Sequence, residues 1–318
     1  MNSTIIFLFQ QVFYFSIPLM ITALGSMFSN RSGVTNIGIE SIMIMGAFAG
    51  SMYLAFFQVN STSMLAYLSA LLVAGLAGMV FALLHAFCSI TLKANQSMSG
   101  ISLNMLAPAL CVFVDRLIFG RQQIEFYVNF MVSKVPVLGD IPIIGPIFFQ
   151  KTYISTYIGL IILIISALIL FKTKFGLRLR ACGEFPQAAD SVGINVYTTR
   201  YICVLISGFL AGMAGQIFVI TTSNQFNCSV SGYGFLATAV MIFGQWNPIK
   251  ICFASFFFGL FKTISATYSG IPFLFSLGIS QNVYKMIPYN FTLLTLIFTS
   301  RSSAAPKAAG KPFEKGQR

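Results

Sequence analysis

Charge is the scarcest property of this sequence. Only 8% of its 318 residues are charged, whereas soluble globular domains carry about 25% charged residues. A folded chain with so few charged side chains could not cover a water-exposed surface, which excludes an ordinary soluble globular protein. Because 57% of the residues are hydrophobic, the composition indicates that lipid is the main solvent of the folded chain.

Motifs for covalent chemistry are also missing. The sequence contains no G-x-x-x-x-G-K-[ST], HExxH or GxSxG motif, so it lacks a P-loop for ATP and the common hydrolase signatures. The six cysteines show no CxxC spacing, and most lie in apolar runs where cysteine acts as a small hydrophobe. We therefore expect a chain that is not an enzyme and that binds neither a metal nor a cofactor.

Nine apolar segments are candidates for membrane spans, since a helix needs about 20 residues to cross a bilayer. The clearest is the uncharged run at 152–171. Gln281, Asn282 and Lys285 interrupt the last segment and leave open a break within it. The sequence predicts an all-α, polytopic transmembrane helical bundle of eight to ten spans, with nine as the best count: 5–28, 34–57, 64–92, 98–114, 152–171, 201–221, 234–249, 251–269 and 274–299.

Basic residues gather in two stretches that flank apolar spans. The loop 172–200 and the tail 301–318 hold ten of the 19 lysines and arginines. Positive charge of this kind marks the cytoplasmic side of a membrane, so both stretches, and with them the C-terminus, are predicted to be cytoplasmic. The N-terminus then lies outside under a nine-span count. This placement of the charge argues against nucleic-acid binding, to which a basic chain is otherwise suited.

The regions outside the spans differ in composition. Residues 1–300 are predicted to form the transmembrane domain, and residues 301–318 a basic cytoplasmic tail. The tail is rich in Ala, Gly and Pro, so we expect it to be solvated and disordered near anionic lipid headgroups. Residues 115–151 form the longest non-spanning stretch. The prolines and glycines at its centre exclude a regular helix, so we expect an external loop that lies against the membrane.

Two apolar strings suggest an internal repeat. Residues 39–48, IESIMIMGAF, align with residues 237–246, ATAVMIFGQW, at an offset of 198 with matching Met, Ile and Gly. In the nine-span topology the two copies cross the membrane in opposite directions. Inverted repeats with broken helices build the central sites of many transporters, so the repeat is a hypothesis that the structure can address.

The first polar cluster lies around Asn36 and Glu40. Glu40 is the single acidic residue of the first hundred positions, and Gly33 and Gly38 loosen the chain beside Asn36. A carboxylate at membrane depth is costly and suggests a functional site. One interpretation is a broken helix whose polar groups line a solute path. The other is that Glu40 caps or hydrogen-bonds a neighbouring span and holds the bundle together.

Two further segments carry polar or small residues in suggestive positions. In 94–104, Asn104 could hydrogen-bond across helices as packing glue or could contact a solute. In 183–194, Glu184 and Pro186 suit the start of a short helix and Gly193 its end. Such a helix in a basic loop suits docking of a cytosolic partner, and a merely solvated loop is the alternative. Gly208 and Gly212 have the small-xxx-small spacing of packed membrane helices.

Several strings resemble those of a known transporter family. RSGVTNIGIESIMIMGAFAG, GLRLRACGEFPQAADSVGINVYTTRYICVLISGFLAGMAG and SGYGFLATAVMIFGQWNPIK resemble motifs of the permeases of the branched-chain amino acid, ribose and nucleoside importer superfamily. The similarity is greatest to the nucleoside and simple-sugar branch. The tail SAAPKAAGKPFEKGQR is also similar, so the resemblance is colinear over nearly the whole chain.

The resemblance implies a membrane-spanning permease subunit of an ATP-binding-cassette importer in a bacterial plasma membrane. Such a subunit translocates a nucleoside or simple sugar inward by alternating access. The implied partners are a cytosolic ATP-binding subunit that uses ATP, a second permease subunit and an extracellular solute-binding protein. The family's docking motif, E-A-A followed by Gly, matches with Gln in place of Glu. The implied coupling residues are Glu184, Gln187, Ala188, Ala189 and Gly193, and the candidate solute-path residues are Asn36, Glu40 and Asn104.

Two other functions compete with this one. An ion-coupled secondary transporter would need ionisable groups within its spans, and Glu40 and His85 are too few for that role. A membrane-embedded enzyme would need a reactive cluster near the headgroups, such as paired aspartates or a Cys-His pair, and the sequence shows none. Both alternatives are therefore weaker than the importer.

Overall fold

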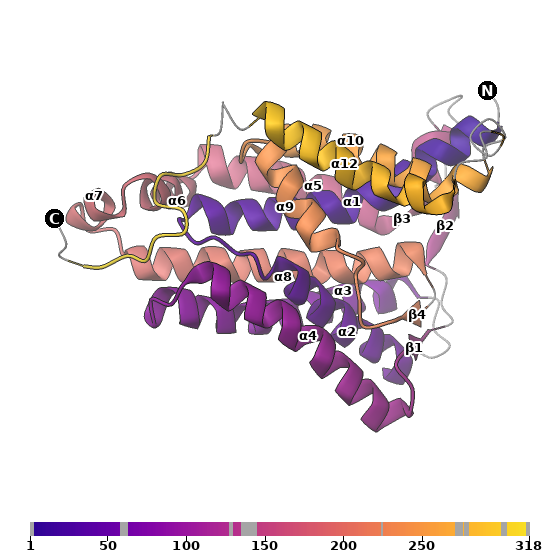
Figure 1. Ribbon diagram of the computed structural model, residues 1–318, viewed down its shortest axis with the longest axis horizontal. Coiled ribbons are helices and arrows are strands. Elements are labelled where there is room, and N and C mark those ends of the chain that lie inside the picture. Colours follow the sequence, from indigo (N-terminus) through magenta and orange to yellow (C-terminus); the bar gives the residue numbers. More distant parts are fainter. Residues whose placement is uncertain are drawn as a thin grey trace.

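The computed structural model shows an elongated bundle of helices (Figure 1). It describes residues 3–57, 63–126, 130–134, 145–223, 225–270, 276, 280–299 and 304–315. Within these residues nearly all regular structure is helical, and most helices lie along the long axis of the molecule. The predicted class, an all-α polytopic membrane bundle, is confirmed.

Seven helices in the described part of the chain are long and apolar enough to cross a membrane. Each coincides with a predicted span to within a few residues, because runs of Leu, Ile, Phe and Ala determine both. These helices are α1 (Ser3–Arg31), α2 (Ile39–Phe57), α3 (Met64–Ala86) with its π-helical continuation η1 (Phe87–Thr91), α4 (Gln96–Phe119), α5 (Ile154–Lys172), α8 (Val196–Thr222) and α10 (Pro248–Thr267).

The predicted span 234–249 takes a different form. It is replaced by α9 (Tyr233–Phe243), a helix of 11 residues, which reaches only about 16 Å at 1.5 Å per residue. Non-helical backbone precedes α9, and after it Gln245 and Trp246 have positive φ angles of 51° and 53° that turn the chain into α10. The last predicted span contains α12 (Gln281–Thr299), and most of 274–280 lies outside the described residues.

Short strands close the end of the bundle opposite α6 and α7. Strand β1 (Ile124–Glu125) pairs antiparallel with β4 (Gln225–Phe226), and β2 (Met131–Lys134) pairs antiparallel with β3 (Gln150–Tyr153), which follows the π-helical turn η3 (Gly145–Phe149). The segment 115–151 was predicted to be an external loop, and its described parts form these pieces after α4 ends at Phe119. The β1–β4 pair connects the end of α4 to the chain that leads into α9.

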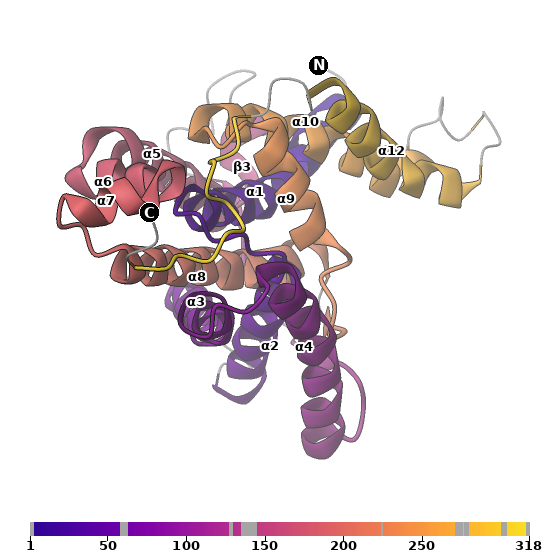
Figure 2. The ribbon, with the colours of Figure 1, turned by 60° about the vertical axis from the view of Figure 1, so that its left-hand side comes forward.

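Helix α8 is the buried centre of the bundle, with α1 on one side and α2 and α3 on the other (Figures 1 and 2). Its small residues allow this. A side chain at Gly46 of α2 would place its Cβ 2.3 Å from the Cα of Gly212, and one at Gly78 of α3 would lie 2.5 Å from the carbonyl oxygen of Gly208. The prediction that Gly208 and Gly212 pack helices is confirmed.

The two arms of the suspected repeat run in opposite directions. Phe48 of α2 contacts Phe226 just before α9, Glu40 bonds to Gly234, and Arg31 bonds to Trp246 just after α9. From Phe226 through Gly234 to Trp246 the residue number rises, while that of the partner in the first half of the chain falls from 48 through 40 to 31. Segments 31–48 and 226–246 are therefore antiparallel, which is the relative direction that an inverted repeat requires.

One end of the bundle, which we call the basic end, carries most of the positive charge. It is formed by α6 (Lys174–Glu184), α7 (Pro186–Ser191) and the C-terminal segment (Figure 1). The tail was expected to be solvated and disordered. Instead, residues 304–315 pack against this end, with Ala308 and Phe313 only 7% and 3% exposed. Their backbone hydrogen bonds and the buried Phe313 ring supply the contacts that composition alone did not indicate.

The Gly212 contact gives a test of this packing. Replacing Gly212 by Ala forces α8 away from α3, because the added Cβ would meet the carbonyl oxygen of Ala74 and the backbone of Gly78. We expect a loss of about 3 kcal/mol in stability and a lower melting temperature of the purified protein in detergent. Gly270→Ala is the matched control, since a Cβ there meets nothing within 4 Å. Equal melting temperatures for the two variants would contradict the packing argument.

Candidate functional site

Two stretches of non-helical backbone lead into buried helix starts. The first, residues 32–38, joins α1 to α2, and the second, of which the structure describes residues 223 and 225–232, joins α8 to α9. Both lead into helices whose first residues are buried: Ile39 is 0% and Tyr233 is 1% exposed. Irregular backbone at membrane depth is tolerated only where protein groups or a water-filled cavity satisfy it, so the partners of these stretches define the candidate site.

Glu40 joins the two stretches. Its Oε1 accepts the backbone N–H of Gly232 at 2.9 Å, and its Oε2 accepts that of Gly234 at 2.6 Å. Glu40 also lies in the first turn of α2, so its carboxylate sits between two helix N-termini, each with unpaired N–H groups and partial positive charge. A side chain at Gly234 would place its Cβ 2.5 Å from the Cα of Glu40. Glu40 thus caps α9, as one of the two sequence interpretations proposed.

Side chains from α3 and α4 hold the first break. His85 Nε2 lies 3.2 Å from the carbonyl oxygen of Thr35, whose own N–H donates to Gln96 Oε1 at 2.7 Å. Asn104 donates to the carbonyl oxygen of Ile37 at 3.0 Å and accepts the N–H of Ser41 at 3.0 Å. Asn104 therefore makes the cross-helix hydrogen bonds expected of packing glue. These three side chains replace the hydrogen bonds that a continuous helix would have made.

Asn36 differs from its neighbours. Its side chain is 1% exposed, and neither amide atom has a hydrogen-bond partner among the described residues. The Nε2 of Gln96 is buried and unpaired in the same way. An unpaired buried polar group costs about 1–3 kcal/mol, so these amides are polar groups that the conformation seen here leaves available for water or a solute. Among the predicted path residues, Asn36 is the one with this property.

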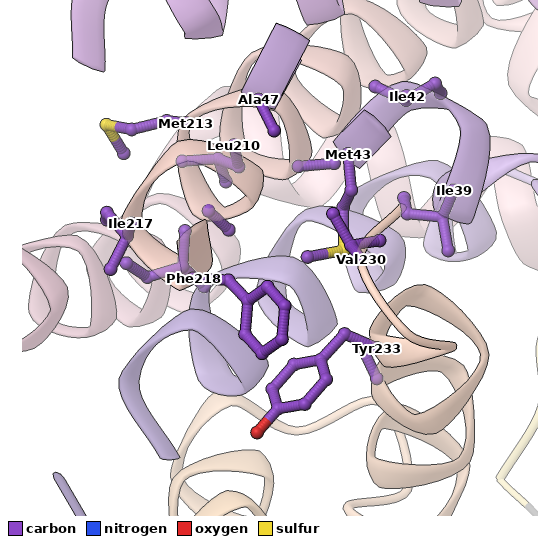
Figure 3. Close-up of a cluster of buried hydrophobic side chains, with 14 of the residues drawn as sticks. Ile39, Ile42, Met43, Ala47, Leu210, Met213, Ile217, Phe218, Val230 and Tyr233 are labelled. Carbon is purple, nitrogen blue, oxygen red and sulfur yellow. The ribbon is translucent and has the colours of Figure 1, made fainter. Parts of the chain in front are cut away.

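Sequence reasoning missed Lys262. This lysine of α10 places its ammonium 5.5 Å from the ring centre of Tyr233 and 5.9 Å from that of Tyr289 on α12. Tyr233 in turn packs on Phe218, with ring centres 4.1 Å apart (Figure 3). Cation–π contacts of this kind help to hold a cation at membrane depth. A single lysine in the apolar string ICFASFFFGLFKTISAT was the available signal.

Asp115 was also missed, because it fell at the start of the predicted external loop. It lies in α4, is 0% exposed, and accepts a hydrogen bond from the Cys228 thiol at 3.0 Å. Cys228 has a φ of 54° and belongs to the second break. Asp115 thus fixes the second break from α4, as Asn104 of the same helix fixes the first.

The short helix predicted within 183–194 is present at the basic end. Helix α7 begins at Pro186, and Gly193 has the positive φ of 84° that ends it. Gln187 and Ala188 are exposed, as are Glu184 and Gly193 at its ends, whereas Ala189 is buried. Ala189 packs in a small apolar cluster with Cys182, and burial raises the pKa of the Cys182 thiol. One face of α7 is therefore anchored and the other is open to solvent.

Comparison with known proteins identifies the family. The family model described as the permease component of the branched-chain amino acid transport system matches residues 8–297. The chain belongs to this permease family.

Individual relatives agree with this assignment. The permease is 43% identical to the guanosine ABC transporter permease protein NupQ of Bacillus subtilis over 96% of this chain and 95% of that protein. It is 40% identical to the nucleoside ABC transporter permease protein NupC of Lactococcus lactis over 95% of each chain. It is 32% identical to the putative glucose ABC transporter permease protein TsgC13 of Haloferax volcanii over 77% of this chain and 73% of that one. No solved structure matches.

The structure divides the predicted site residues of the permease into two groups. Asn36, Glu40 and Asn104 come together at the first break, inside the bundle. The coupling residues Glu184, Gln187, Ala188, Ala189 and Gly193 come together on and beside α7, at the basic end. Among the described residues, no hydrogen bond or ion pair joins one group directly to the other. A connection between them must therefore run through the backbone and side chains that lie in between.

Glu40 offers a direct test of the junction between α2 and α9. Glu40→Ala leaves the N–H groups of Gly232 and Gly234 buried and unpaired, at a cost of about 1–3 kcal/mol each. We expect a lower melting temperature of the purified permease and loss of solute uptake in cells. Glu40→Gln keeps one carbonyl acceptor and should lie between Ala and the unaltered protein on both measures. Unchanged stability and uptake in Glu40→Ala would refute the capping role.

Proposed function

We propose that this permease is the membrane-spanning subunit of an ATP-binding-cassette importer that moves nucleosides inward. The observation that carries the proposal is the identity of 43% and 40%, over at least 95% of this chain, to permeases named for guanosine and nucleoside transport. The more distant relative named for glucose transport makes a simple sugar the second candidate solute.

The basic end is proposed to face the cytoplasm. Lysines and arginines gather there from the last turns of α1 and α5, from α6, from the first turns of α8 and α10, from the loop between η1 and α4 and from the tail: Arg31, Lys93, Lys172, Lys174, Arg178, Arg180, Arg200, Lys250, Lys307, Lys311 and Lys315. The positive-inside rule places such an end in the cytoplasm. The C-terminus and α7 are then cytoplasmic, in the plasma membrane of a bacterium.

Helix α7 is proposed to dock the cytosolic ATP-binding subunit. Its exposed Gln187 and Ala188 adjoin two exposed apolar side chains, Phe185 and Val192, which are 64% and 74% exposed. Exposed apolar side chains rimmed by polar ones suit a protein interface. Because this chain has no P-loop, the permease itself would bind no ATP and catalyse no reaction, and the partner would hydrolyse the nucleotide.

A second permease subunit, identical or different, is proposed to complete the channel, and an extracellular solute-binding protein to deliver the solute. Helices α4 and α12 project on either side of α9 (Figure 2). Several of their side chains are exposed and apolar, among them Met105, Leu117 and Leu293. We propose that the solute passes along the side of the chain where α9 begins, near Asn36, Lys262 and the half-exposed Tyr289.

The proposed mechanism is alternating access. Helix α2 and the short helix α9 run antiparallel and meet at Glu40, and each follows non-helical backbone. Elements of this kind can reorient about the junction without breaking a continuous helix. ATP binding and hydrolysis in the partner would move α7, and α2 and α9 would rock to open the path inward.

The competing functions have weaker support. Two relatives that share at least 40% identity with this chain over nearly its whole length are named as ABC transporter permeases. These names favour neither an ion-coupled transporter nor a membrane-embedded enzyme. Glu40 and His85, the groups that an ion-coupled transporter would use, are engaged in holding the two breaks. Among the described residues, no three His, Cys, Asp or Glu side chains are grouped to hold a metal ion.

Uptake of radiolabelled guanosine tests the solute. Cells with and without the gene are compared, with excess ribose and branched-chain amino acids as competitors. We expect uptake to depend on the gene, to resist both competitors and to stop when ATP is depleted. Guanosine uptake that is unchanged without the gene would contradict the nucleoside assignment. Uptake that survives ATP depletion but is abolished by an uncoupler would instead support the ion-coupled transporter.

A further inference from the structure

The C-terminal segment 304–315, which we call the strap, is bound to the basic end at several points. The N–H of Ala308 donates to the carbonyl oxygen of Gly183 at 2.9 Å, and the N–H of Gly310 donates to that of Gly33 at 3.2 Å. Farther along, Glu314 pairs with Lys93 at 3.1 Å. Figures 1 and 2 both show this yellow segment running across the basic end from α6 to the start of α8.

These contacts add to the direct packing of Gly183 against the backbone of Arg31, and they link the surroundings of the two groups of predicted residues. Gly183 lies at the end of α6, immediately before Glu184 and the docking helix. Gly33 lies in the first break, where its φ of 93° turns the chain away from α1. The strap therefore makes backbone hydrogen bonds both to the base of the docking helix and to the broken segment that leads to Glu40.

A buried ring anchors the strap beside the docking helix. Phe313 is 3% exposed and contacts the ring of Tyr197 with centres 5.4 Å apart. The same apolar cluster contains Cys182 of α6 and Ala189 of α7. The docking helix and the strap thus share one small core, so a displacement of α7 acts directly on Phe313.

Arg200 binds both the strap and the first break. This arginine of α8 is 1% exposed. Its Nε donates to the carbonyl oxygen of Ser32 at 3.2 Å, and its Nη1 donates to that of Lys311 at 3.2 Å. One buried guanidinium therefore holds the strap and the first break together. Its planar fork of donors suits this geometry better than a single ammonium would.

We propose that residues 304–315 are a coupling strap that transmits movement of the docking helix α7 to the break at 32–38, and so to the junction of α2 and α9. The inference rests on the proposed function, because the ATP-binding subunit is what moves α7. The strap also lies within that partner's reach, since Lys315 lines a groove of about 420 Å³ together with Asp190, Gly193 and Asn195 beside α7.

The test uses the complete transporter, reconstituted in liposomes with its ATP-binding subunit, second permease and solute-binding protein. Phe313→Ala removes the buried anchor, and truncation after residue 303 removes the whole strap. Two quantities are measured: the amount of ATP-binding subunit that copurifies, and the guanosine imported per ATP hydrolysed. For both variants we expect unchanged copurification and about a tenfold fall in import per ATP, a size typical of coupling between sites.

The matched control is Lys307→Ala, which removes a charge from an exposed position of the strap and should leave both quantities unchanged. Unchanged import per ATP in Phe313→Ala would overturn the coupling role of the strap. A fall in import per ATP in Lys307→Ala would also overturn it, because the charge of the tail alone would then account for the effect. Loss of the ATP-binding subunit from Phe313→Ala would overturn it too, in favour of a docking role. Failure of the unaltered complex to import guanosine would instead refute the proposed function.

Discussion

The carboxylate of Glu40 accepts the backbone N–H groups of Gly232 and Gly234 and so holds the start of α9 against α2. Lipid offers no partner for backbone N–H and C=O groups, so membrane chains normally satisfy them within continuous helices. This chain interrupts two helices inside the bundle and must supply partners from side chains. One carboxylate between two helix N-termini satisfies N–H groups of α9 and places negative charge where both helix dipoles favour it.

The remaining polar side chains of the bundle serve the same need. His85, Gln96 and Asn104 bind the backbone of the first break, and Asp115 binds the Cys228 thiol in the second. The glycines of α8 allow α2 and α3 to pack closely against it. The result is a bundle in which continuous helices, α8 among them, hold two segments of non-helical backbone. A transporter needs this combination, because a rigid frame can then carry elements that reorient.

How much of this could be predicted from the sequence depends on the range of the interactions involved. The long spans follow from local hydrophobicity, so they were predicted closely. The apolar run at 234–249 looks like another span, and only tertiary contacts with Glu40 and Arg31 show that it contains a short helix and a turn. Asn36, Glu40 and Asn104 were found because polar residues stand out in apolar runs, whereas Lys262 was overlooked within a span counted by its average hydrophobicity.

The tail shows most clearly that composition alone does not predict which segments pack against the bundle. Its Ala, Gly, Pro and Lys residues are typical of solvated segments, yet one phenylalanine and a few backbone hydrogen bonds fix it to the basic end. Each partner lies more than a hundred residues away in the sequence, so no local pattern contains the information. Helix α7, by contrast, was predicted from Pro186 and Gly193 because helix ends are set by local backbone chemistry.

Alternating access requires α2 and α9 to move relative to the other helices during transport. Pulsed electron paramagnetic resonance can detect this movement, with spin labels at the exposed Phe235 of α9 and Met105 of α4 in the reconstituted transporter. The partly exposed Cys88 and Cys252 would first be replaced by Ser. We expect the label–label distance distribution to shift between the nucleotide-free and ATP-bound complexes. Identical distributions in the two states, in a complex that still imports solute, would contradict it.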